Sequence, residues 1–328
     1  MKAIGILGGA TLLAVAVWLF RPLRPAGLAS HPAPSLSYEE SLRLVAELEA
    51  EDARQANASG GLMEGCGTKL LTHGSRTSHV VVLFHGLTNC PAQFDSLAGV
   101  LHARGLNVLV PRLPRHGLAD KMTDEPGRID ARELCAFSDR IVDMAQGLGE
   151  HVTIAGLSIS GAMVSWLAQE RTDVDRAVAI APLVGVPQAR GALRPPATRL
   201  ALAIPNLSIW WDSKQRENLG GPKHVYPRFA TRAVAASLLV GAALQNAAAK
   251  REPGCRSIVV VTVGGDRAVD NAEVARLVEA WRAWPGVEVK TYEFPAGLAL
   301  SHDVVDPEQV GGNPALTYPV LVEYIDPR

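Results

Sequence analysis

Short apolar runs alternate with helix-like stretches along most of the chain after about residue 78. The runs are rich in Val, Ile and Leu and are continuously apolar, which is typical of strands buried on both faces of a sheet. Expected strands cover residues 79–84, 106–110, 151–155, 176–180, 257–263 and 287–294, and expected helices cover 91–104, 130–148, 159–171, 271–284 and 315–325. This order predicts a mostly parallel sheet with helices on both sides.

The alternation stops after Pro182 and resumes after Pro253. The segment between them contains two adjacent prolines, two adjacent tryptophans and an apolar helix expected near 230–249, and no β-rich run interrupts it. It therefore predicts a helical insertion, at about 183–252, between two late strands.

Residues 3–20 form an uncharged apolar segment, with a lysine before it and arginines and prolines after it. A helix needs about 20 apolar residues to span a bilayer, so this segment is at the lower limit. It ends in Trp-Leu-Phe-Arg, a poor cleavage site, which favours an uncleaved membrane anchor. A signal cleaved near Ala29-Ser30 and a buried core helix are the alternatives, although a core helix would need a polar face. We expect a membrane-anchored or exported protein, and the positive charges on both flanks leave the orientation open.

Between this segment and the first strand, the composition changes twice. Residues 21–37 are rich in Pro, Ala and Ser and indicate a linker. A helix is expected from Tyr38 to about Gln55, with Ser37 as N-cap and Glu40 as its partner in a capping box. The expected parts are therefore an anchor or signal with linker, a helix with its loop, and a main domain, at 1–37, 38–66 and 67–328.

Composition excludes some classes of function. The 328 residues carry a formal net charge of -1 with scattered Lys and Arg, so no nucleic-acid partner is expected. The four cysteines lack metal-site spacing, and no metal site is predicted. Cys66 and Cys90 flank neighbouring strands and could form a disulfide in an exported protein. Four unbridged thiols, including Cys135 and Cys255, are the alternative.

The segment Val152–Ala162 predicts a strand that turns sharply into a helix at Gly-Leu-Ser. This is the arrangement of a nucleophile elbow, which raises a serine side chain above the sheet edge. Small residues are required two positions before and two after the nucleophile. Gly156 meets the first requirement, and Ser160 stands at the second, where glycine is usual. Ser158 is therefore the candidate nucleophile.

A second turn follows the strand that ends at Phe84, in the sequence His-Gly-Leu-Thr. The backbone N–H of Leu87 in this turn and that of Ile159 after the elbow would form an oxyanion hole. We expect His85 to hold the turn rather than act as a base.

A serine nucleophile needs a base and a group that orients the base. Asp266 follows the strand 257–263, and functional groups collect at strand ends in such sheets. His302 lies in the loop after the last strand, which gives the chain order Ser, Asp, His. Asp270 is the competing acid, and we expect it to cap the next helix instead.

The other histidines are weaker candidates. His116 lies in a loop after another strand, and we expect it to brace that loop or to lie near the site. No elbow or acid is apparent in the sequence near His73, His79, His151 and His224. Asp303 could tune or brace its neighbour His302.

Five motifs together resemble the α/β-hydrolase superfamily. They are LFHGLT at 83–88, PRLPRHG at 111–117, GLSISG at 156–161, GGDRAVD at 264–270 and LSHDVVDP at 300–307. The nearest resemblance is to the branch of monoacylglycerol lipases, carboxylesterases and serine-aminopeptidase-like hydrolases, over roughly residues 67–326. It implies an α/β-hydrolase fold, triad roles for Ser158, Asp266 and His302, oxyanion-hole roles for Leu87 and Ile159, and a cap at the insertion.

The activity that these residues predict is hydrolysis of a carboxylic ester through an acyl-enzyme. Apolar residues of the insertion would line an acyl pocket, and such a lining favours medium-chain esters or monoacylglycerols as substrates. The alternative is that these residues only pack the cap on the core. The pocket candidates are His116, Ile209, Trp210 and Trp211. No cofactor is expected, since no Gly-rich phosphate loop follows the first strand. The alternatives are a peptidase or amidase, a C–C hydrolase and a non-catalytic binding protein of the same fold.

Overall fold

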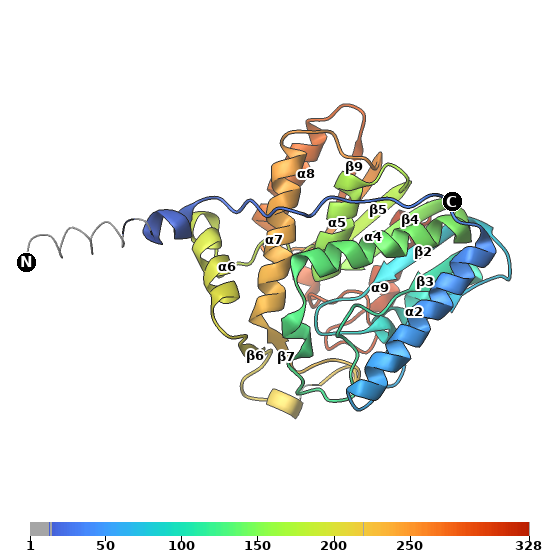
Figure 1. Ribbon diagram of the computed structural model, residues 1–328, viewed down its shortest axis with the longest axis horizontal. Helices are drawn as coiled ribbons and strands as arrows, with labels where there is room; N and C mark the ends of the chain where they lie inside the picture. The colour runs from blue at the N-terminus through green and yellow to red at the C-terminus, as the bar shows by residue number, and fades with distance from the viewer. Residues whose placement is uncertain (1–12, 14, 219, 328) are drawn as a thin grey trace, which may run out of the picture.

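The computed structural model describes residues 13, 15–218 and 220–327, and its centre is a seven-stranded sheet (Figure 1). The strand order is β1-β3-β2-β4-β5-β8-β9, with β1 antiparallel to β3 and every other neighbouring pair parallel. The bounds are β1 Lys69–Leu71, β2 Thr77–Phe84, β3 Asn107–Val110, β4 Gly149–Leu157, β5 Arg176–Ile180, β8 Ser257–Val263 and β9 Glu288–Phe294. The predicted mostly parallel sheet is confirmed.

The inner strands are continuously apolar because helices cover both faces of the sheet. In β2, every residue from Val80 to Phe84 is fully buried. The edge strand β9 is half exposed along most of its length and correspondingly contains Glu, Lys and Thr. Removal of apolar surface from water, about 25 cal/mol per Å², is the main term that stabilises this core.

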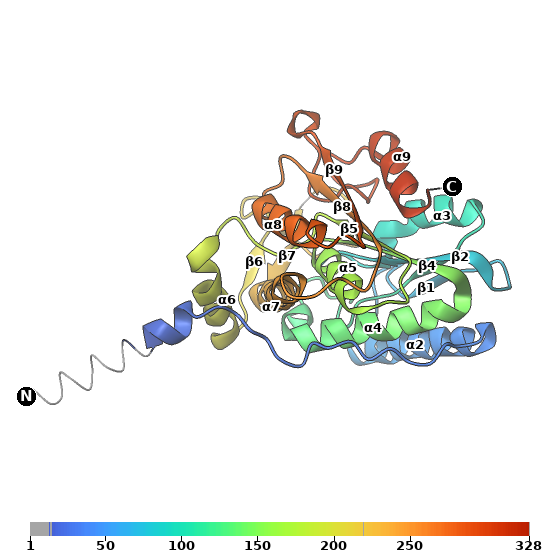
Figure 2. The ribbon, with the colours of Figure 1, turned by 90° about the horizontal axis from the view of Figure 1, so that it is seen from above.

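Helices form a layer on each face of the sheet (Figure 2). On one face α3 packs near α9, and on the other α4, α5, α7 and α8 pack in sequence, with α2 outside α4. The bounds are α2 Tyr38–Ala58, η1 Pro91–Phe94, α3 Asp95–Ala103, η2 Glu125–Arg128, α4 Ala131–Leu148, α5 Ile159–Glu170, α7 Thr231–Ala248, α8 Asn271–Arg282, η5 Ala296–Leu298 and α9 Pro314–Ile325.

Local capping explains where several helices begin. The Ser37 hydroxyl accepts from the Glu40 N–H while the Glu40 carboxylate accepts from the Ser37 N–H, so the predicted capping box is present. Asp270 caps α8 through the N–H of Ala272, as predicted. Asp270, the competing candidate for the acid, is thus engaged as a helix cap, whereas Asp266 lies four residues before it.

The insertion between β5 and β8 is not entirely helical. It contains η3 Gly191–Leu193, α6 Arg194–Ala203, η4 Arg216–Asn218 and a two-stranded antiparallel sheet of β6 Ser208–Trp210 and β7 Arg228–Ala230. The prediction that the insertion contains no strand is thus wrong, because strands of three residues are too short to show a periodicity in the sequence. The apolar helix α7 lies against α5 in the helical layer of the core.

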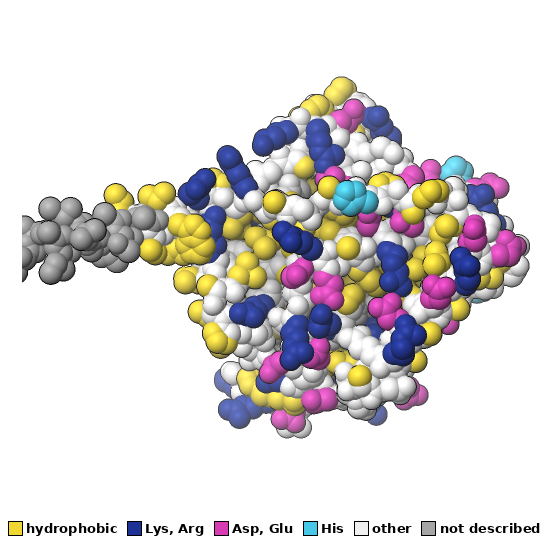
Figure 3. Space-filling model, viewed as in Figure 1, with side chains coloured by type: hydrophobic (Ala, Val, Ile, Leu, Met, Phe, Trp, Pro, Cys, Tyr) yellow, Lys and Arg dark blue, Asp and Glu magenta, His cyan; other side chains and the backbone are white. Residues whose placement is uncertain are grey.

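The segment before α2 crosses the outer helices of the molecule. Trp166 of α5 donates to the Leu28 carbonyl, and Asp139 of α4 accepts from the Ser30 hydroxyl and the His31 N–H. Arg199 of α6 donates to the carbonyls of Leu19 and Arg21, and exposed apolar side chains gather where these segments meet (Figure 3).

Most of the predicted anchor, residues 3–20, lies outside the described residues. Within the described part of the chain, no helix is long and apolar enough to cross a membrane. The predicted location of the protein stays a prediction.

Cys66 and Cys90 form a disulfide, with Cα atoms 5.1 Å apart. The bridge joins the chain just before β1 to the loop after β2. Of the two interpretations left open by the sequence, the structure adopts the one with a bridge, and Cys135 and Cys255 are buried free thiols.

Candidate active site

Ser158 lies at the sharp turn from β4 into α5, with φ +61° and ψ −115°. A non-glycine residue rarely adopts positive φ, and it persists only where its surroundings hold it. The Ser158 N–H donates to the Ile180 carbonyl at 2.9 Å, and the Ser158 carbonyl accepts from the N–H of Leu183. The neighbouring strand β5 and the loop after it therefore hold the turn that presents this side chain.

Close packing around the turn explains which positions must be small. A Cβ at Gly156 would lie 2.7 Å from the Ser160 carbonyl oxygen, and one at Gly161 would lie 2.8 Å from the Ile180 carbonyl oxygen. The glycine after Ser160 thus meets the requirement on the helix side. Ser160 itself is fully buried, and its hydroxyl donates to the His85 carbonyl at 2.5 Å.

One predicted oxyanion donor, Ile159, directly follows this serine, and the other, Leu87, belongs to the turn after β2, the strand that pairs with β4. Ile159 is the first residue of α5, so its N–H has no acceptor within the helix. The Gly86 carbonyl accepts from Nδ1–H of His85 at 2.9 Å and from the Asn89 N–H at 3.2 Å. Because the carbonyl and N–H of one peptide point in opposite directions, these bonds also set the direction of the Leu87 N–H.

His85 has the bracing environment that we predicted. Its Nε2 accepts from the Leu113 N–H at 3.0 Å while Nδ1 serves the Gly86 carbonyl. Burial, helped by the charge of nearby His116, holds the pKa of His85 well below its usual value. A neutral imidazole with both nitrogens bonded to backbone is not placed to accept a proton from Ser158.

Asp266 and His302 come together after the neighbouring strands β8 and β9. Nδ1 of His302 donates to Oδ2 of Asp266 at 2.6 Å, and the Asp266 carboxylate is fully buried. Burial acts to raise the pKa of Asp266, but hydrogen bonds from His302 and from the N–H groups of Ala268 and Val269 outweigh it and lower the pKa. The pair thus has the geometry of a carboxylate that could orient an imidazole.

The second nitrogen of His302 is buried and has no hydrogen-bond partner among the described residues. Ser158 is 8% exposed and its hydroxyl is not hydrogen-bonded to this nitrogen. Catalytic hydrogen bonds are often long without substrate and shorten when it binds. The structure therefore joins two of the three predicted side chains directly.

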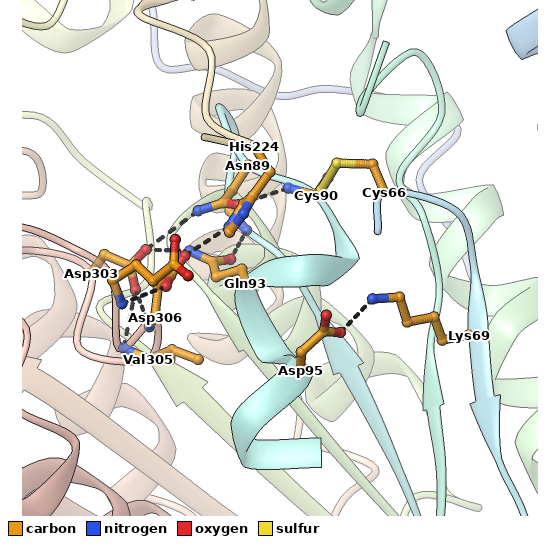
Figure 4. Close-up of polar contacts among 12 residues, drawn as sticks. Cys66, Lys69, Asn89, Cys90, Gln93, Asp95, His224, Asp303, Val305 and Asp306 are labelled. Carbon is orange, nitrogen blue, oxygen red and sulfur yellow. Dashed lines mark hydrogen bonds and ion pairs between the residues drawn. A yellow bond between two sulfur atoms is a disulfide. The ribbon is translucent and has the colours of Figure 1, made fainter. Parts of the chain in front are cut away.

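The helix that follows Ser158 is linked to the loop of His302 through the His85–Gly86 turn. Ser160 of the elbow helix donates to the turn, and the side chain of Gln93 accepts from the Gly86 N–H at 2.8 Å. Nε2–H of Gln93 donates to Asp303, the residue after His302, at 2.6 Å (Figure 4). The elbow and the histidine loop are thus both hydrogen-bonded to one turn.

Sequence analysis missed Gln93 and the role of Ser160. Gln93 is fully buried next to Phe94 in the short helix η1, which follows the His-Gly turn. In the sequence it is one of several polar residues in an expected helix, which gives no indication of this burial. Its contact with Asp303 spans 210 residues of chain, which no local pattern indicates.

Two histidines with no acid nearby in the sequence pattern have acid partners in the structure. One is the exposed His151, whose Nδ1 lies 3.2 Å from Oδ1 of Asp175, and the other is His224. Its Nε2 lies 2.8 Å from Oδ2 of Asp306, and both side chains are largely buried. The pair, visible in Figure 4, joins the insertion to the loop that carries His302. The two residues are far apart in the sequence, so spacing did not reveal the pair.

The predicted pocket residues lie in different environments. His116 is fully buried, its Nδ1 bonds to the Pro114 carbonyl, and burial lowers its pKa to about 4. Trp211 is 45% exposed, and its indole N–H donates to the Thr88 hydroxyl next to Leu87. Ile209 is 45% exposed on β6, and Trp210 is partly buried on the same strand. Trp211 thus bonds to the residue that follows Leu87 in the His-Gly turn.

Fold and site define an α/β-hydrolase. A family model described as the alpha/beta hydrolase family matches residues 81–310, and the chain belongs to this family.

More specific similarities cover shorter segments. The chain is 31% identical over 94 residues to a pyrethroid hydrolase of Sphingobium wenxiniae, a match that covers 28% of this chain and 31% of that protein. It is 27% identical over 113 residues to a thermostable monoacylglycerol lipase of a Bacillus species, which covers 33% of this chain and 42% of that protein. The matched segments therefore span less than half of either relative.

A solved structure shares the fold over a longer range. The monoacylglycerol lipase of Paleococcus ferrophilus superposes with a TM-score of 0.59 at 19% identity, covering 79% of this chain and 98% of that one. At this identity, the likeness concerns the fold alone.

Proposed function

We propose that the protein is a serine hydrolase that cleaves carboxylic esters through an acyl-enzyme, with Ser158 as nucleophile. The observation that carries the proposal is the 2.6 Å bond between His302 and Asp266. It leaves Nε2 of His302 buried and without a hydrogen-bond partner in the part of the chain that the structure describes. Such a nitrogen can act as a general base, and the hydroxyl of Ser158, at the strained turn, is the group from which it would accept a proton.

In the proposed reaction, Ser158 Oγ attacks the ester carbonyl carbon and Nε2 of His302 takes its proton. The negative charge that develops on the carbonyl oxygen is stabilised by the N–H groups of Leu87 and Ile159. When the tetrahedral intermediate collapses, the C–O bond to the alcohol breaks and His302 gives its proton to the leaving oxygen. Water then attacks the acyl-enzyme by the same route and releases the acid and free Ser158.

Asp266 supports this cycle without exchanging its own proton. Its lowered pKa keeps it ionised, and its bond to Nδ1–H holds the imidazole in the tautomer with a lone pair on Nε2. The carboxylate also stabilises the imidazolium that forms during attack.

The proposed substrate is an ester with an apolar acyl chain, such as a monoacylglycerol. Trp211 supports this, since its indole N–H donates to Thr88, the residue after Leu87. Its ring is tilted by 45° against that of Phe229, with ring centroids 4.7 Å apart. The names of the two relatives, a pyrethroid hydrolase and a monoacylglycerol lipase, are those of enzymes that act on apolar esters, and support the same class.

The test is an activity profile with p-nitrophenyl esters of graded chain length and a monoacylglycerol. Wild type is expected to hydrolyse them and to be labelled by a fluorophosphonate probe. Ser158→Ala is expected to lose both, with at least a thousandfold lower turnover. The matched control is Ser165→Ala, a buried serine of the same helix whose hydroxyl bonds to the Gly161 carbonyl.

Near-normal ester turnover in Ser158→Ala would end the proposal. Diketones and peptide amides in the same panel distinguish the C–C hydrolase and amidase alternatives. Absence of labelling by the probe, together with no turnover of any substrate in the panel, would point to a binding protein.

A further inference from the structure

Two consecutive peptides of the His-Gly turn have four backbone polar groups, two carbonyls and two N–H groups. Hydrogen bonds hold three of them. The His85–Gly86 peptide has its carbonyl bound by the Ser160 hydroxyl and its N–H bound by Oε1 of Gln93. The next peptide, Gly86–Leu87, has its carbonyl bound by His85 Nδ1–H and the Asn89 N–H. The Leu87 N–H has no acceptor among the described residues, and it is the proposed oxyanion donor.

Gln93 uses both ends of its amide. Its oxygen accepts from Gly86 and its NH₂ donates to Oδ2 of Asp303, so the side chain spans from the oxyanion turn to the histidine loop (Figure 4). Gln93 as a whole is only 1% exposed, so bulk water does not compete for either hydrogen bond.

Asp303 in turn organises the loop after His302. Its other oxygen accepts from the N–H groups of Val305 and Asp306, both at 3.0 Å, and Asn89 adds a longer bond of 3.4 Å. Among the described residues, the donors to this carboxylate are all uncharged. Because Gln93 bonds to both Gly86 and Asp303, a displacement of Gln93 would shift the His-Gly turn and the loop that carries His302 together.

We propose that Gln93 and Ser160 are positioning residues for the reaction, which hold the His85–Gly86 peptide at both ends and so aim the Leu87 N–H at the developing oxyanion. Through Asp303, Gln93 also keeps this donor in register with His302. This proposal rests on the proposed ester hydrolysis. It also gives a reason for serine at position 160, where glycine is usual.

The first test compares Gln93→Met with Gln169→Met. Gln169 is equally buried, and its amide bonds to Trp281 and to the carbonyls of Arg251 and Glu252, at the far end of α5. Both variants lose a buried amide network, but only Gln93→Met releases the turn. We expect Gln93→Met to lower kcat about a hundredfold with KM changed less than about threefold, since misplaced groups cost turnover. Gln169→Met is expected to keep kcat.

The serine arm has its own pair. Ser160→Ala and Ser165→Ala each remove a buried hydroxyl that donates to a backbone carbonyl in or near α5. Ser160→Ala is expected to lower kcat about tenfold, and Ser165→Ala to leave it within about twofold. Equal effects of the two substitutions would overturn the role of Ser160.

A polarity exchange separates positioning from general damage. Gln93→Glu keeps the acceptor for Gly86 but sets a second carboxylate against Asp303, and its kcat should fall. Adding Asp303→Asn restores one donor and one acceptor in reversed order, and should recover most of the lost turnover. A double variant no better than Gln93→Glu would contradict the pairing.

Amide hydrogen exchange gives a readout besides activity. The Gly86 N–H should exchange faster in Gln93→Met than in wild type or in Gln169→Met. Ester turnover by wild type combined with unchanged kcat and unchanged exchange in Gln93→Met would remove the clamp and leave the proposed function intact. A wild type that hydrolyses no ester would instead remove the proposed function, and the catalytic role of the clamp with it.

Discussion

Nδ1 of His302 and Oδ2 of Asp266 lie 2.6 Å apart, although 36 residues separate them in the chain. The residues follow β8 and β9, which pair in parallel from Ser257 opposite Glu288 to Val263 opposite Phe294. Both loops thus leave the same edge of the sheet side by side. A carboxylate can only accept, so the contact selects the tautomer of His302 with its proton on Nδ1.

The first prediction concerns this tautomer. Asp266→Asn should lower kcat for ester hydrolysis about 10³- to 10⁴-fold, because an amide NH₂ facing Nδ1 favours the opposite tautomer and removes the lone pair from Nε2. Steady-state kinetics on a p-nitrophenyl ester measure it. The control is Asp270→Asn, since asparagine caps α8 as well as aspartate does. Equal losses in the two variants would mean that Asp266 has no special role.

Much of the fold could be predicted from the sequence because the strands are buried on both faces. The run Ser257–Val263 was expected as a strand and is β8 with the same bounds, and Arg176–Ile180 is β5. The position of Asp266 followed from the end of β8. A strand end is a local signal, so the residues placed there could be named in advance.

Contacts between loops could not be predicted in the same way. Gln93 and Asp303 meet only because the ends of β2 and β9 return their loops to one edge, and neither residue has a repeating pattern around it. His224 and Asp306 are a second example. The disulfide was left open because spacing alone does not give the Cα separation on which it depends.

The second prediction concerns the tight approach of α5 to β5. Gly161→Ala should lower the free energy of unfolding by about 2–3 kcal/mol, because its Cβ would meet two backbone groups, the Ile180 carbonyl and Pro182 Cα, within 3 Å. Gly99→Ala is the control, since that exposed position in α3 has nothing within 4 Å of the added Cβ. It should stabilise by about 0.5–1 kcal/mol. Urea unfolding measures both, and a Gly161→Ala variant as stable as wild type would contradict the packing.

The third prediction concerns the disulfide between Cys66 and Cys90. It closes a loop of 24 residues, so its reduction should lower the free energy of unfolding by about 3 kcal/mol. Thiol titration should find two reactive groups in the unfolded oxidised protein and four after reduction, because Cys135 and Cys255 are free. The Cys66→Ala/Cys90→Ala variant should show no response to reductant. A wild type indifferent to reductant would indicate that the bridge does not form.

The last prediction concerns acid stability. Burial lowers the pKa of His116 from 6.5 to about 4, so between these pH values the unfolded chain binds a proton that the folded protein does not. The folded state therefore loses stability as the pH falls from 6.5 towards 4, by about 3 kcal/mol from this residue. His85, whose pKa is lowered for the same first reason, acts in the same direction. Urea unfolding at pH 7, 6, 5 and 4.5 should thus show a decline that is shallower in His116→Gln. If the substitution leaves the slope unchanged, His116 must already accept a proton in the folded protein, and its ring cannot be enclosed as the structure has it.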